Sequence, residues 1–190
     1  MWWVELLNSI VGLLDSGAGG GGGAYESIAT ASGNGVATIT FSSIPSTYKH
    51  LQVRGTARHS AAVSDIGDIQ YLINGDTTSS YAQHYLFGNG SSASSVGQSA
   101  IANGNIRNAL CYDADTANTF GSFILDIHDY ASTTKNKTAR YFSGVDTNGT
   151  GRTTLGSTLW INTSAITSLT FRTGGANFVN GTVFSLYGIK

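Results

Sequence analysis

From residue 24 onward, apolar and polar residues alternate in short runs that are separated by clusters of Gly, Asn and Ser. Alternation with a period of two is the pattern of a β-strand with one buried face, and small polar clusters are typical of turns. No segment of this part keeps a helical period for long. A spacing of about ten residues between runs predicts roughly nine or ten strands and an all-β fold, an antiparallel jelly-roll-like β-sandwich.

The run HLQVRGTAR at residues 50–58 illustrates the pattern, because Leu51 and Val53 fall on one face and Arg54 and Arg58 on the other. The run IQYLINGDT ends in an Asn-Gly pair, which is a strong hairpin signal. In the run YAQHYLF, all three aromatic residues lie on one face. Further strands are predicted from Glu26 and at residues 36–41, 106–112, 120–130, 137–145, 154–161, 166–172 and 182–189.

The start of the chain follows a different pattern. Over residues 2–14, large apolar residues recur at three- and four-residue spacing and leave only a thin polar stripe, which predicts an amphipathic helix. The apolar arc is too wide for one flat surface and suits a trimeric bundle or a groove. Two tryptophans at the tip resemble interface anchors. The residues predicted to dock are Trp2, Trp3, Leu6, Leu7, Ile10 and Leu14.

Three interpretations of this segment stay open, namely docking or self-association, a helix folded back on its own domain, and an interfacial membrane helix. We predict the first. The apolar run of about 14 residues is shorter than the roughly 20 that cross a bilayer, and no Lys or Arg precedes Lys49 to engage anionic lipid. The predicted organisation is a docking helix at residues 1–16, a glycine-rich linker at residues 17–23 and a sandwich domain at residues 24–190.

Composition narrows the classes of function. Charged residues make up 11% of the chain, against roughly 25% in an average soluble protein, so the surface is polar but neutral. A net charge of −1 gives no long-range attraction to nucleic acid. Cys111 is the single cysteine, which excludes an intrachain disulfide and a cysteine metal cage. The first residues carry no positive charge before the apolar run, so we expect synthesis and folding in a cytoplasm.

Candidate chemistry is sparse. The run LDIHDY places Asp126 and His128 on one strand face with Asp129 at the following turn, but no second cluster supplies a third metal ligand. The aspartate pairs at 113 and 115, at 65 and 68, and at 126 and 129 could be catalytic carboxylates, and they fit turns equally well. The chain contains neither G-x-S-x-G nor G-K-[ST]. We therefore predict no enzyme, no metal and no cofactor.

Carbohydrate binding is the alternative from another class. Jelly-roll domains occur among lectins, and the chain has nine tyrosines and many asparagines. Tyr81, Tyr85 and Trp160 could form an aromatic platform for a glycan. The same aromatic residues could instead pack the sandwich core, and we favour that interpretation.

Six stretches resemble a family of small virion proteins of tailed bacteriophages. They are YESIATASGNG, FSSIPSTYKHLQVRG, INGDTTSSYAQHYLFGNGSS, DIHDYASTTKNKT, LWINTSAITSLTF and FSLYGIK, and they are spread from residue 25 to residue 190. The resemblance implies a structural protein of a phage particle, of the tail-fibre or head-decoration type. It transfers no catalytic residues.

The sequence thus predicts a non-enzymatic virion protein that is made in the host cytoplasm. Residues 1–16 would bind capsid, neck or tail proteins, and the sandwich would project as a fibre or decoration module, as a homotrimer. A lectin-like module that binds a host receptor is the alternative. We expect no binding to nucleic acid or membrane.

Overall fold

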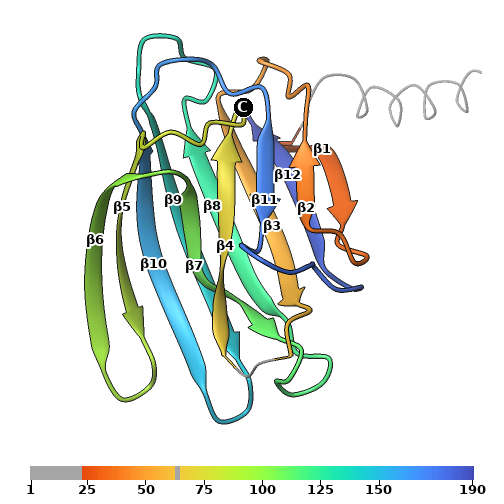
Figure 1. The fold of residues 1–190 in the computed structure, drawn as a ribbon. Helices are drawn as coiled ribbons and strands as arrows, with labels where there is room; N and C mark the ends of the chain where they lie inside the picture. The colour runs from red at the N-terminus through yellow and green to blue at the C-terminus, as the bar shows by residue number, and fades with distance from the viewer. Residues whose placement is uncertain (1–22, 63–64) are drawn as a thin grey trace, which may run out of the picture.

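The computed structural model describes residues 23–62 and 65–190, and all regular structure in this part is β (Figure 1). The all-β prediction is confirmed. The predicted helix at residues 1–16 and all but the last residue of the predicted linker lie outside the described residues. The strands are β1 (Tyr25–Ser32), β2 (Thr38–Phe41), β3 (His50–His59), β4 (Ile66–Ile73), β5 (Tyr81–Gly88), β6 (Ala93–Ile101), β7 (Gly104–Tyr112), β8 (Gly121–His128), β9 (Lys137–Asp146), β10 (Gly151–Trp160), β11 (Leu169–Arg172) and β12 (Val183–Ile189).

The strands form two layers. One is an antiparallel sheet in the order β1-β12-β3-β8-β9-β10-β5-β6, called here the long sheet. The other, the short sheet, has the order β2-β11-β4-β7 and lies in front of the long sheet in Figure 1. The end of β3 joins the layers, because Arg58 and His59 pair in parallel with β7.

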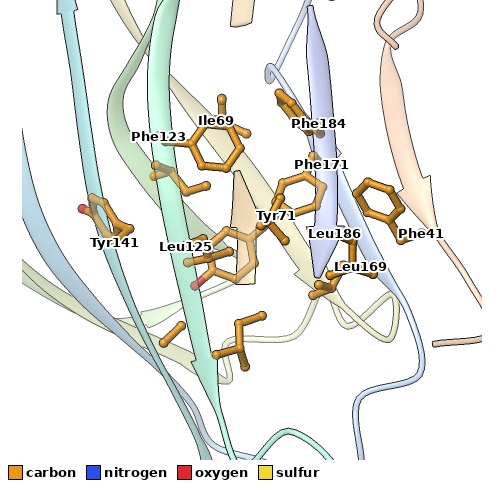
Figure 2. Close-up of a cluster of buried hydrophobic side chains, with 14 of the residues drawn as sticks. Phe41, Ile69, Tyr71, Phe123, Leu125, Tyr141, Leu169, Phe171, Phe184 and Leu186 are labelled. Atoms are coloured by element: carbon orange, nitrogen blue, oxygen red, sulfur yellow. The ribbon is translucent and has the colours of Figure 1, made fainter. Parts of the chain in front are cut away.

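The core lies between the two layers and is rich in aromatic rings. Phe171 of β11 in the short sheet lies 6.4 Å from Phe123 of β8 and 5.3 Å from Phe184 of β12, measured between ring centroids (Figure 2). All three side chains are buried. Full burial of one such ring contributes about 1.5–3 kcal/mol, so this cluster is a main source of the attraction between the layers.

Several core rings lie directly over a glycine on the neighbouring strand. Tyr141 pairs with Gly156, and Tyr71 pairs with Gly104. A Cβ atom at either glycine would come within 2.2 Å of the opposing tyrosine ring. The ring therefore occupies the space of the missing side chain, and glycine is required at these two positions by close approach.

Two local predictions need correction. The alternation in β3 predicts Arg58 on the face of Arg54, but Arg58 is 5% exposed because the strand there crosses to the short sheet. Its guanidinium donates to four carbonyls of the loop at residues 113–119. The Asn74-Gly75 pair does form a tight turn, with positive φ at both residues. The turn makes no hairpin, because β4 lies in the short sheet and β5 in the long sheet.

Replacing Gly156 with alanine is expected to lower the free energy of unfolding by about 1–3 kcal/mol, because the added methyl group overpacks against Tyr141. Gly144→Ala is the matched control, since its Cβ would lie 3.4 Å from the nearest atom, the Arg152 carbonyl oxygen. The control should change stability by less than about 0.5 kcal/mol. Urea unfolding of both variants measures the difference, and equal effects would contradict the assigned register.

Candidate interaction surface

The outer face of the long sheet, which turns away from the short sheet, carries a row of large apolar side chains. In this row Ile124 of β8 pairs with Phe142 of β9, Phe142 with Leu155 of β10, and Leu155 with Leu86 of β5. We call these four residues the apolar ladder. Side chains paired across strands lie about 5 Å apart, so the ladder is continuous.

The ladder is open to solvent over the part of the chain that the structure describes. Ile124 is 38% exposed, Phe142 51%, Leu155 57% and Leu86 52%. Single exposed apolar residues are common on protein surfaces, but a contiguous set of this kind is typical of an interaction site. The ladder is therefore the strongest candidate for a functional surface.

A row of polar side chains lies beside the ladder on the same face, two residues away along each strand. Its members, in the order of the strands, are Gln52, Asp126, Arg140, Ser157 and His84. The Gln52 amide donates to the Asp126 carboxylate at 2.7 Å. The Arg54 guanidinium in turn donates to the Gln52 side-chain oxygen at 2.6 Å. The polar row therefore contains both positive and negative side chains, and the hydrogen bond from Gln52 holds the Asp126 carboxylate in place.

Small side chains form the corresponding row on the other flank of the ladder. They are Ser122, Gly144, Thr153 and Gly88, paired across β8, β9, β10 and β5. Because these side chains are short, the apolar ladder stands above them.

Two hollows adjoin the ladder. One holds about 540 Å³ and is lined in part by Leu86, Leu155 and Arg140. The other holds about 400 Å³ between Ile124 and Phe142 of neighbouring strands. Both hollows can receive apolar side chains from a partner, because each is bounded by ladder residues.

The metal candidate in the run LDIHDY is not assembled. The Asp126 carboxylate binds Gln52, whereas the Asp129 carboxylate accepts a hydrogen bond from the Lys135 ammonium at 2.7 Å. His128 accepts a hydrogen bond from Arg140 at 3.2 Å. Burial lowers the pKa of His128, and the Arg140 charge lowers it further. Within residues 23–62 and 65–190, no three His, Cys, Asp or Glu side chains converge on a metal position.

The other aspartate pairs also have structural partners. Asp68 forms an ion pair with Arg107 at 2.6 Å and accepts from the backbone of Asn108. Asp113 lies 3.6 Å from buried Arg58. The Asp115 carboxylate accepts from the backbone amide of Tyr112, the last residue of β7. Each of these three carboxylates therefore has a structural partner that explains its position in the fold.

Two of the three aromatic residues considered for a glycan platform lie in the core instead, as the favoured interpretation predicts. Tyr81 is fully buried and Trp160 is 1% exposed. Their rings lie 6.5 Å apart within the core. Tyr85 is partly buried beneath Arg107, with 5.2 Å between the guanidinium carbon and the ring centroid. The three residues do share one sheet face, but that face turns toward the core.

Asp76 explains how Trp160 is held. Its carboxylate accepts hydrogen bonds from the indole N–H at 2.7 Å, from the Ser80 hydroxyl at 2.6 Å and from Thr78. Burial raises the pKa of Asp76, but the hydrogen bonds from Ser80, Thr78 and Trp160 lower it by more. The net result is a pKa well below the ordinary value. This cluster is a structural anchor at the end of β10.

Comparisons of the chain with family models, with curated proteins and with solved structures gave no match. The described residues contain no helix that could span a membrane. The surface must therefore be interpreted from its own geometry.

Sequence reasoning missed the apolar ladder although the signal is present. In the run SFILDI, Phe123 and Leu125 follow the buried period, and Ile124 interrupts it. In the same way, Phe142 follows buried Tyr141. Apolar residues out of phase on neighbouring strands would have indicated a second apolar face.

Removing the carboxylate in Asp76→Ala leaves the buried Trp160 N–H without an acceptor and should cost about 1–3 kcal/mol of unfolding free energy at neutral pH. Because folding lowers the pKa of Asp76, its contribution is complete above the unfolded pKa of about 3.9 and is lost as the pH falls below it. Urea unfolding at several pH values should show the wild-type advantage narrowing in acid. Asp146→Ala is the control, because among the described residues that carboxylate accepts only from a turn amide, at 2.9 Å.

Proposed function

We propose that the protein is a non-enzymatic structural component of a tailed-phage virion. In this proposal the particle holds the chain through residues 1–16, and the β-rich domain is displayed as a fibre or decoration module. The observation that carries the proposal is the apolar ladder on a broad, otherwise polar sheet face, because such a surface suits a subunit that packs against neighbours. The stretches that resemble phage virion proteins indicate that this assembly is a phage particle.

The strand order supports a jelly-roll-like sandwich. When the hairpins β5–β6 and β9–β10 are set aside, the remaining strands pair as β1-β12-β3-β8 and β2-β11-β4-β7. This is the order of two four-stranded Greek-key sheets in a jelly roll, an architecture found in viral capsid and lectin domains. Both hairpins extend the same sheet beyond β8, and they carry three of the four ladder residues.

The neutral composition is consistent with a crowded assembly. With 11% charged residues, neighbouring copies meet little like-charge repulsion. Attachment through residues 1–16 to capsid, neck or tail proteins, and a homotrimer formed by the same segment, remain predictions from the sequence. Several weakly held copies on one particle would add avidity.

Deletion of residues 1–16 tests the attachment. The truncated protein should fold, with an unchanged thermal melt of the β-rich domain, and should be absent from purified phage particles that assemble in its presence. Wild-type chain expressed in the same way is the control for incorporation. Particles that contain the truncated chain at the wild-type level would contradict this mode of attachment.

Copy number in purified particles tests the role in the virion. Quantitative mass spectrometry against the major capsid protein should give a fixed stoichiometry, comparable with the capsid subunits for a decoration protein and far lower for a tail fibre. If washed particles contain no copies of the chain, the virion proposal is wrong.

A further inference from the structure

We propose that the outer face of the long sheet binds the same face of a second copy of this chain. The two sheets would pack in the aligned manner of stacked β-sheets, about 10 Å apart and rotated by about 30°. The two-fold axis would lie between β9 and β10 and bisect the angle between the strand directions of the two copies. This inference concerns the isolated chain and does not depend on the proposed virion role.

The two-fold axis matches the apolar ladder to itself. An axis between β9 and β10 brings β9 opposite β10 of the second copy and β8 opposite β5 of the second copy. Phe142 then faces Leu155 of the second copy, and Ile124 faces Leu86 of the second copy. All four ladder residues of each chain lie within about 7 Å of the axis, so the relative rotation of the sheets leaves these contacts in place.

The polar row meets no like charge under the same operation. Asp126 on β8 faces His84 on β5 of the second copy, and Arg140 on β9 faces Ser157 on β10 of the second copy. In the ladder row, Arg54 faces Ser95 of the second copy. No two charges of the same sign meet in these pairs, whereas an axis along the ladder would place Arg54 opposite itself.

The available area is sufficient for a stable dimer. Six strands from β3 to β6, over a length of about seven residues, present a face of about 600–700 Å². Standard interfaces bury about 600–1,000 Å² on each partner. The ladder is apolar at the centre, with the polar row on one flank and the row of small side chains on the other, which resembles the apolar centre and more polar rim of a typical interface. A second copy therefore covers the ladder without another component.

The molar mass of the full chain, measured by light scattering over a range of concentrations, is the first test. The wild-type chain should form dimers or species built from dimers, and Phe142→Thr should raise the dissociation constant of the dimer about 30-fold. Ile161→Thr is the control, because Ile161 is 55% exposed but lies beyond the end of β10 and outside the ladder. This control should leave the mass unchanged. Thermal melts establish that both variants are folded.

A cysteine pair tests the orientation of the two copies. Asp126 and His84 of one chain are separated by three strand spacings, about 14 Å, which is too far for an intrachain disulfide. Across the interface the facing Cα atoms lie about 10 Å apart, which is beyond the reach of a direct disulfide, but their side chains point toward each other. A short bifunctional thiol reagent, which bridges sulfur atoms about 5 Å apart, should therefore give covalent dimers of the double variant Asp126→Cys/His84→Cys and none of either single variant. Native Cys111 is buried and should not react under these conditions.

Three results would overturn the inference. A monomeric wild-type chain at high concentration would exclude the dimer. A dimer or trimer with the same stability in Phe142→Thr would place the contact elsewhere, including the predicted helix at residues 1–16. Covalent dimers in either single-cysteine variant, or their absence in the double variant, would exclude the proposed axis.

Discussion

The cross-strand register of the long sheet is the constraint on which the other features depend. Tyr141 must lie over Gly156 on the core side, because only a glycine leaves space for its ring. Phe123 meets Gly55 on the core side in the same way. With a side-chain period of two, this register forces Phe142 to the outer face. The aromatic core and the exposed apolar ladder are thus two consequences of one pairing.

The two hairpins added to the sheet explain why the outer face is broad. The β9–β10 and β5–β6 hairpins continue the sheet beyond β8. The short sheet and its aromatic residues cover the inner side except at β6, which is largely exposed. Because few charges lie on the outer face and the Asp126 carboxylate is already bonded to Gln52, the desolvation cost of bringing a neighbouring surface close is moderate. The geometry favours an assembly subunit.

Sequence alternation predicted most strands because one buried face imposes a period of two. It missed β6, whose residues Ala93–Ile101 are largely exposed and are held by backbone pairing with β5 at the sheet edge. It also placed Arg58 on the exposed face, because the alternation of one strand does not show that β3 crosses to the short sheet at that residue. The aromatic residues proposed for glycans, Tyr81 and Trp160, could not be distinguished from core residues by type alone. In the sequence, the apolar ladder is indicated only by apolar residues at positions where the alternation of the strand predicts polar ones.

Hydroxyl-radical footprinting of the full chain at increasing protein concentration tests the central claim most directly, since it reads the solvent exposure of individual ladder side chains. Oxidation of Phe142 and Leu155 should fall as the concentration rises, while oxidation of Ile161 stays constant. Equal oxidation of Phe142 at all concentrations, at the level expected for a half-exposed ring, would show that no second copy covers the ladder.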